Sequence, residues 1–179
     1  QAMRKMSGSG SAALAAILGG MEVTKLTNPL GGVIFLGAWQ SDLLVFAWLM
    51  VVMYVTKLLD GLDGLSTSVV SVGTLAVLLL SLSAAYFQPD VALFASIGFG
   101  ALLGFLVWNW SPAKIFLGEG GSLFLGFILG VLAVISGGKI AIALLVMGLP
   151  IMDVAWTIIR RLAAGQNPFC IFMRLFPLT

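Results

Sequence analysis

The sequence contains no histidine, a single cysteine and few charged residues. Without histidine, these 179 residues lack the usual imidazole base and the commonest metal ligand. The lone Cys170 excludes a disulfide between two residues of this chain. Only 9% of the residues are charged, against roughly 25% in an average soluble domain. The net charge of +2 is too small to indicate a nucleic-acid partner.

Long apolar segments take up most of the chain. Hydrophobic residues make up 60% of it, and the mean hydropathy is +1.13. Segments of about 20 apolar residues are long enough to span a bilayer as helices. We therefore predict an all-α fold, a polytopic membrane helix bundle in a single domain over residues 1–179, in contact with membrane lipid. The candidate helices cover Ser9–Val23, Leu43–Leu58, Leu65–Phe87, Val91–Trp108, Ser122–Ser136 and Ile140–Arg160.

The first candidate helix and the segment after it have their own features. A run of alanine, glycine and serine favours a short membrane helix over a signal peptide, whose apolar region would be richer in leucine. The segment "TNPLGGVIFLGAWQSD" then begins at Thr27 and contains Pro29 and two glycines before "VIFLGAW". Proline and glycine interrupt helices, so a short strand or hairpin is expected here.

The basic residues predict the orientation in the membrane. Cytoplasmic loops carry an excess of lysine and arginine. If successive helices alternate in direction, Lys25 and Lys139 fall on one face of the membrane, and the opposite, richer face holds Arg4, Lys5, Lys57, Lys114, Arg160 and Arg161. We therefore expect a multi-pass plasma (inner) membrane protein with this richer face in the cytoplasm and the hairpin outside.

Two loops that are distant in sequence bring carboxylates to the predicted cytoplasmic face. The first is "LLDGLDGL", with Asp60 and Asp63, and the second is "NWSPAKIFLGEGGSLFLG", with Glu119. Carboxylates are costly beside lipid, so a charged group near a membrane helix indicates function. Both loops are rich in glycine, which lets a ligand approach the backbone closely.

The second loop carries residue types that suit a nucleotide phosphate. Backbone N–H groups at the start of a helix favour phosphate, and here "GEGGS" precedes a helix that is expected to begin near Ser122. Glu119 is a hard oxygen ligand of the kind that Mg²⁺ takes together with substrate phosphates. Lys114 is a cation for phosphate, and Phe116 offers a face on which a base could stack.

Each of these features also has a purely structural interpretation. Asp60 or Asp63 could cap a helix, and the glycines of "GEGGS" could serve only turns or close helix packing. Asp153, three residues after Pro150 in the last candidate helix, could equally pair with a neighbouring helix. None of these features identifies an activity by itself.

Together the two loops resemble those of the polyprenyl-phosphate N-acetylhexosamine-1-phosphate transferases. "TNPLGGVIFLG" and "GLPIMDVAWTIIRRLAAGQNPF" also match, so the resemblance covers about Gly20 to Phe169. It implies an enzyme that transfers a sugar-1-phosphate from a UDP-N-acetylhexosamine to a polyprenyl phosphate such as undecaprenyl phosphate, with release of UMP. Such a step starts peptidoglycan or another surface glycan on a lipid carrier. The sequence leaves open which sugar is carried and whether the protein forms a homodimer.

The resemblance also implies roles for individual residues. Glu119 stands at the family's metal-binding Asp, which implies Mg²⁺, with Mn²⁺ as an alternative. Phe116 matches an aromatic residue that packs on uracil, Asp63 an acid that contacts uracil, and Asn109 a polar residue of the nucleotide pocket. The expected catalytic residues are thus Asp60, Asp63 and Glu119. The expected substrate-binding residues are Asn109, Lys114, Phe116, Gly118, Gly120 and Ser122.

The chain departs from the family pattern at several points. Lys57 replaces a usual Asn, Glu119 replaces an Asp, and the family's earlier acidic pair is absent. After Phe169 the atypical tail 170–179 lacks the expected Asp and His. We therefore expect a piece of a longer protein, with a catalytically inactive or transporter-like membrane subunit as the alternative. A CDP-alcohol phosphotransferase is disfavoured, because the Asp60-Gly61 pair lacks the Ala-Arg that should follow it.

Overall fold

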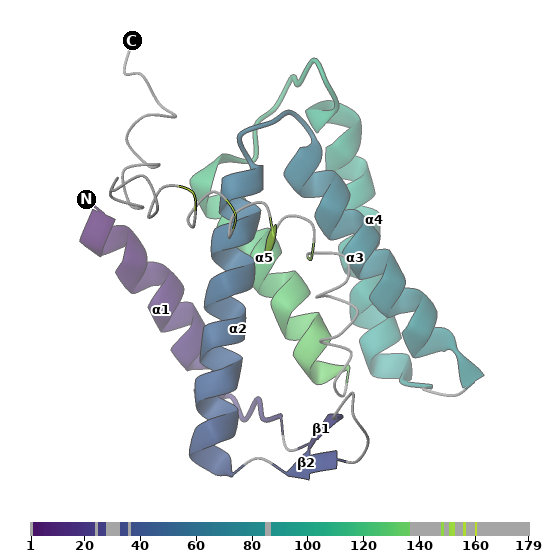
Figure 1. Ribbon diagram of the computed structural model, residues 1–179. Coiled ribbons are helices and arrows are strands. Elements are labelled where there is room, and N and C mark those ends of the chain that lie inside the picture. Colours follow the sequence, from purple (N-terminus) through teal and green to yellow (C-terminus); the bar gives the residue numbers. More distant parts are fainter. Residues whose placement is uncertain are drawn as a thin grey trace.

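The computed structural model describes residues 2–23, 25–27, 33–35, 37–84 and 87–136, with isolated positions at 148, 151, 152, 156 and 160. Figure 1 shows the long helices side by side, with a small hairpin at one end of the bundle. The elements of these residues are α1 (Ala2–Leu18), β1 (Lys25–Thr27), β2 (Val33–Phe35), α2 (Ala38–Leu59), α3 (Leu65–Leu82), α4 (Pro89–Asn109) and α5 (Gly118–Ile135).

The described helices confirm the predicted membrane bundle. By length and composition, α2, α3, α4 and α5 can each cross a membrane, whereas the apolar part of α1, Gly8–Leu18, is shorter. The sixth candidate helix, with Pro150 and Asp153, lies outside the described residues apart from a few isolated positions, and so does the tail 170–179.

Several helix boundaries differ from those predicted, since α1 begins at Ala2 rather than at Ser9 and α3 ends at Leu82 rather than at Phe87. Two further differences have clear local reasons. α1 ends at Leu18 rather than at Val23, because Gly20 adopts a left-handed conformation, with a φ of +84°. The N–H groups of Gly19, Gly20 and Met21 bond back to carbonyls of the last helical turn, as at a glycine C-cap. α2 begins at Ala38 rather than at Leu43, where the Gly37 N–H donates to Gln40 Oε1 at 3.1 Å.

The predicted hairpin is confirmed. β1 and β2 are antiparallel, with Lys25 opposite Phe35 and Thr27 opposite Val33. In Figure 1 the hairpin lies near the start of α2, at the end of the bundle away from the α2–α3 and α4–α5 loops. The two loops that carry the candidate carboxylates therefore share one end of the bundle, as the alternation of helices predicted.

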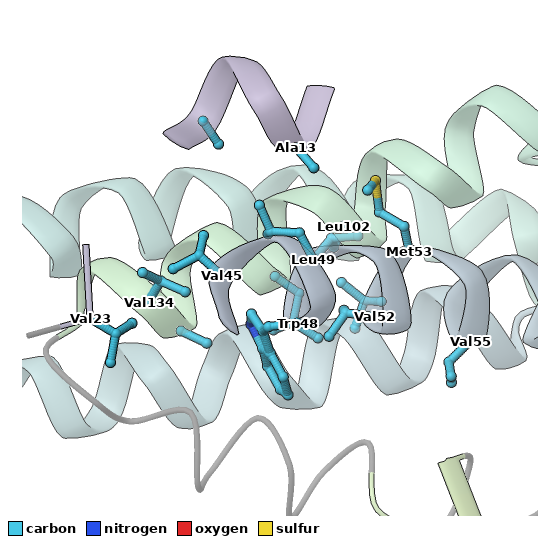
Figure 2. Packing of buried hydrophobic residues seen from close by; sticks show 14 residues of the cluster. Ala13, Val23, Val45, Trp48, Leu49, Val52, Met53, Val55, Leu102 and Val134 are labelled. Carbon is cyan, nitrogen blue, oxygen red and sulfur yellow. The ribbon is translucent and has the colours of Figure 1, made fainter. Parts of the chain in front are cut away.

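Glycines on α5 allow α2 and α5 to pack closely. A Cβ atom at Gly126 would lie 2.7 Å from Met53 Cα and 2.8 Å from Thr56 Oγ1, and one at Gly130 would lie 2.9 Å from Leu49 Cδ2. The Trp48 indole also donates to the Gly130 carbonyl at 3.2 Å. Figure 2 shows apolar side chains of α2, such as Leu49, at the centre of the buried cluster. Small residues of this kind let the backbones of membrane helices approach.

An apolar groove separates part of α4 from α5. Its volume is about 570 Å³, and its lining runs along α4 from Val91 to Phe105 and along α5 as far as Ile135, with Val70 of α3 as a further wall. Leu117, just before α5, also lines it. The groove therefore extends from the loop end of the bundle through most of its length.

We predict that Gly126→Ala destabilises the fold by about 1–3 kcal/mol, because the new methyl group must displace α2 backbone rather than a flexible side chain. Gly104→Ala is the matched control, since a Cβ there meets nothing within 4 Å, and it should leave stability unchanged or raise it by up to about 1 kcal/mol. Thermal unfolding of the protein in nanodiscs would compare them. Equal melting temperatures for both variants would show that the close contact of Gly126 with α2 is not required for stability.

Candidate functional site

The turn between α2 and α3 is pressed against the end of α4. Asp60 follows directly after α2, and Gly64 precedes α3 with a φ of +72°. A Cβ atom at Gly64 would lie 3.2 Å from the Asn109 carbonyl oxygen and 3.6 Å from Trp110 Cα. Gly64 is therefore needed for two reasons, a left-handed backbone and the close approach of the second loop.

A hydrogen bond joins the two predicted loops directly. The Ala113 backbone N–H donates to Asp63 Oδ2 at 3.2 Å, across 50 positions of sequence. Asp63 is exposed, so its carboxylate holds the second loop while one side remains open to solvent. The structure thus brings Asp63 to the second loop as predicted, and its proposed contact with uracil stays a prediction.

Asn109 anchors the loop that carries Phe116. Its side chain is 4% exposed, its Oδ1 accepts from the Thr67 hydroxyl at 2.9 Å, and its Nδ2 donates to the Ile115 carbonyl at 2.9 Å. Both ends of the amide are therefore engaged by protein groups. Asn109 acts here on the position of the loop, and a direct contact with nucleotide stays a prediction.

The first turn of α5 contains the glycine cluster. The helix begins at Gly118, which corrects the predicted start near Ser122, because Gly118 at a φ of +71° turns the chain into the helix four positions earlier. The first backbone N–H groups of any helix have no acceptor within that helix. A Cβ at Gly118 or Gly120 would meet nothing within 4 Å, so this turn leaves space for a ligand.

Ser122 connects this first turn to Asp60. Ser122 is fully buried, and its hydroxyl bonds the carbonyls of Gly118 and Glu119 at 3.2 Å each. The hydroxyl also interacts with the Asp60 side chain. Partial burial raises the pKa of Asp60 above its ordinary 3.8, and the bond from Ser122 lowers it in part. Asp60 lies just outside the membrane-spanning segment Ala38–Leu59. The first and second loops therefore meet at this pair as well as at Asp63.

Lys57 and Glu119 form a second link between α2 and α5. Lys57 Nζ lies 3.8 Å from Glu119 Oε1, and the Lys57 side chain is only 8% exposed whereas that of Glu119 is 46% exposed. The Lys57 ammonium is thus the buried member of the pair, and the Glu119 carboxylate is the member nearer to solvent. Sequence reasoning did not predict this pair.

Lys114 and Phe116 extend from the second loop. Phe116 is 71% exposed, which leaves its ring free of cover by the described residues. Lys114 Nζ lies 5.5 Å from the centre of the Trp108 ring, a distance at which a cation is attracted to an aromatic face. Both side chains are therefore available at the surface of the loop.

The carboxylates suit a cation that is completed by substrate. Within the part of the chain that the structure describes, no group of three or more His, Cys, Asp and Glu side chains could hold a metal by itself. Mg²⁺ commonly binds through one or two carboxylates together with waters and substrate phosphates. Half-exposed Glu119, beside the open first turn of α5, fits this mode.

Thr67 and Gly64 are site residues that sequence reasoning missed. Thr67 is wholly buried and holds Asn109, and Gly64 lets the loops meet. The "DGLDG" motif contained the signal for Gly64, because glycine follows aspartate in a turn. Nothing in the sequence distinguished Thr67 from the other hydroxyl residues of α3, such as Ser71 and Thr74, which bond to carbonyls of their own helix.

Comparison with known proteins identifies relatives of this sequence. Residues 1–137 match the family described as glycosyl transferase family 4. A probable undecaprenyl-phosphate N-acetylglucosaminyl 1-phosphate transferase of Bacillus subtilis is 35% identical over 136 residues, which is 72% of this chain and 37% of that protein. A decaprenyl-phosphate N-acetylglucosaminephosphotransferase of Mycolicibacterium smegmatis is 30% identical over 193 aligned residues, 93% of this chain and 47% of that protein.

A third relative comes from a second branch. The phospho-N-acetylmuramoyl-pentapeptide-transferase of Bacillus licheniformis is 40% identical over 112 residues, 62% of this chain and 33% of that protein. The chain therefore spans between a third and a half of the length of these curated relatives.

We predict that Thr67→Val loosens the second loop. The substitution leaves Asn109 Oδ1 without its donor in a buried place, which costs about 1–3 kcal/mol. Amide hydrogen exchange over 110–117 should accelerate. Thr74→Val is the control, because Thr74 is equally buried but donates to the Val70 carbonyl of its own helix. Unchanged exchange in Thr67→Val would show that Asn109 does not hold the loop.

We also predict a pH-dependent stability difference for Asp60→Asn. Because the folded-state pKa of Asp60 is raised, the folded protein binds this proton more tightly than the unfolded chain does. The resulting stabilisation is complete below the ordinary pKa of 3.8 and is lost as pH rises through the folded-state pKa.

The measurement is the melting temperature from pH 4 to pH 8, in nanodiscs. Asp60→Asn should become progressively more stable than the natural protein as pH rises. Ser122→Ala removes an interaction that favours the Asp60 carboxylate. In this variant the loss of stability with rising pH should therefore occur at higher pH than in the natural protein. If the difference in melting temperature between Asp60→Asn and the natural protein does not vary with pH, the pKa of Asp60 is not raised by burial in the folded protein.

Proposed function

The chain belongs to glycosyl transferase family 4, and we propose that it forms the nucleotide-sugar side of an enzyme that transfers a sugar-1-phosphate from a UDP-N-acetylhexosamine to a polyprenyl phosphate. It is a multi-pass membrane protein, and its relatives are named as phosphotransferases that act on undecaprenyl or decaprenyl phosphate. The donor, the acceptor and the site residues are part of the proposal.

One observation carries the proposal. The end of α2 and the turn after it meet the α4–α5 loop and the first turn of α5, which are far away in sequence. Three contacts between charged or polar groups join them: Asp63 with Ala113, Asp60 with Ser122, and Lys57 with Glu119. A membrane protein that needed only a stable turn would not require carboxylates on both sides of the junction. A phosphate-rich substrate with a divalent cation does require them.

The proposed roles follow from where each group lies. The open first turn at Gly118 and Gly120 would receive the diphosphate, where helix N–H groups and the helix dipole favour negative charge. Glu119 would hold Mg²⁺, which would neutralise the diphosphate charge when bound. The exposed ring of Phe116 would stack on uracil, and Asp63 would contact the base. These roles suit a site at the cytoplasmic surface of the plasma membrane.

The reaction needs positioning more than covalent help from the protein. An oxygen of the polyprenyl phosphate attacks the phosphorus that carries the sugar, a new P–O bond forms, and the bond to the UMP phosphate breaks. UMP leaves with the electron pair of that bond. Fixed groups that hold both phosphates in line and balance their charge supply most of the acceleration in such transfers.

We predict that Asp63→Ala and Glu119→Ala each reduce UMP release from UDP-N-acetylglucosamine, in the presence of undecaprenyl phosphate and Mg²⁺, by about 100-fold or more. Asp90→Ala is the control, because exposed Asp90 lies in the first turn of α4, at the opposite end of that helix from Asn109, and its activity should stay within about twofold.

The possible results of these assays test the roles of single residues separately from the proposed activity. Near-normal turnover in Asp63→Ala or Glu119→Ala would remove that residue from the site. A large loss in Asp90→Ala would overturn the assignment of the loop end as the active end. A natural chain that neither releases UMP nor binds UDP-N-acetylglucosamine would contradict the proposal for this chain.

A further inference from the structure

The Lys57 side chain is buried at the site, although its position near the end of α2 would allow it to extend into water. It lies in the last turn of α2, where a cation is favoured by the helix dipole by about 0.3–1 kcal/mol. A side chain that served only the dipole or the membrane orientation could extend into water. Instead, 92% of the Lys57 side chain is covered, and its ammonium lies beside Glu119.

Burial of an ammonium is costly unless an anion and hydrogen bonds compensate for it. Glu119 supplies the anion, at 3.8 Å from Lys57 Nζ. The pair is asymmetric, because the carboxylate is 46% exposed while the ammonium is not. The Glu119 carboxylate therefore faces a fixed positive charge at Lys57, while nearly half of its side chain surface stays exposed.

The same carboxylate is the one proposed above to hold a divalent cation. A metal ion on Glu119 would lie within several ångströms of the Lys57 ammonium, and two positive charges at such a distance repel substantially even at a high effective dielectric constant. Lys57 therefore opposes the binding of a metal ion that arrives alone. A metal ion that arrives with a diphosphate brings enough negative charge to offset the repulsion.

We propose that Lys57 is a positioning residue that makes divalent-cation binding at Glu119 depend on the nucleotide diphosphate. This inference rests on the proposed function, in which Glu119 is the metal ligand and the substrate carries the diphosphate. The site would hold metal weakly when empty and tightly when the donor is bound. When transfer breaks the donor's diphosphate, UMP would carry less negative charge to offset the repulsion from Lys57, so metal ion and UMP would leave together.

The test is Mn²⁺ binding, used as a spectroscopic probe by electron paramagnetic resonance, to the full chain in nanodiscs of uncharged lipid. Lys57→Gln should bind Mn²⁺ about tenfold more tightly than the natural chain in the absence of nucleotide. UDP should tighten Mn²⁺ binding strongly in the natural chain and about tenfold less in Lys57→Gln. Lys57→Arg keeps the charge and should behave like the natural chain.

Two further variants separate this effect from general surface charge. Gln40→Glu makes the same change in net charge as Lys57→Gln but lies at the exposed start of α2, and it should change Mn²⁺ affinity by less than about twofold, because distant exposed charges are screened. In a Glu119→Gln background the gain from Lys57→Gln should disappear, as a double-mutant cycle requires of a direct coupling. Melting temperatures of all variants would show that each is folded.

The inference is overturned if Lys57→Gln binds Mn²⁺ no more tightly than the natural chain, if Gln40→Glu gives the same gain, or if no folded variant binds Mn²⁺ at all. Its failure is distinguishable from failure of the proposed function. UDP binding without the Lys57 effect leaves the function standing, whereas a chain that binds neither UDP nor Mn²⁺ contradicts both.

Discussion

The close packing of α2 against α5 at Gly126 is the constraint on which the rest of the structure depends. Met53 Cα and Thr56 Oγ1 lie less than 3 Å from where a Cβ would stand, so the two backbones approach closely at a position that only glycine permits. This contact lies two turns into α5 and one turn before the end of α2. It therefore fixes the end of α2 beside the start of α5, and Lys57 meets Glu119 as a consequence.

Helix packing brings the two loops near each other, and polar contacts at the loop end then hold them in position. Asp63 holds the Ala113 backbone, and Thr67 holds Asn109, which holds Ile115. Each contact ends on the loop that presents Phe116. A site whose groups are already in place loses little entropy when the substrate binds, which is how electrostatic stabilisation becomes effective. The arrangement thus links apolar packing within the membrane to a preorganised set of groups at the loop end, where we propose the phosphate site.

The sequence predicted the bundle, the hairpin and the meeting of the two loops, because apolar length and charge distribution determine which ends share a membrane face. It did not predict that α5 begins at Gly118, since glycine is a poor helix former and only the left-handed turn there shows the start. The partners of Lys57 and Thr67 depend on the rotation of one helix against another. Periodicity does not specify that rotation when most positions are apolar.

The central claim is that both loops contact one nucleotide sugar. Photoaffinity labelling with an azido-uridine analogue of UDP-N-acetylglucosamine, followed by mass spectrometry of the full chain in nanodiscs, tests it most directly. The account predicts cross-links in both 60–67 and 109–122, with protection by UDP. Labelling that spares both segments, or that UDP does not reduce, would contradict it.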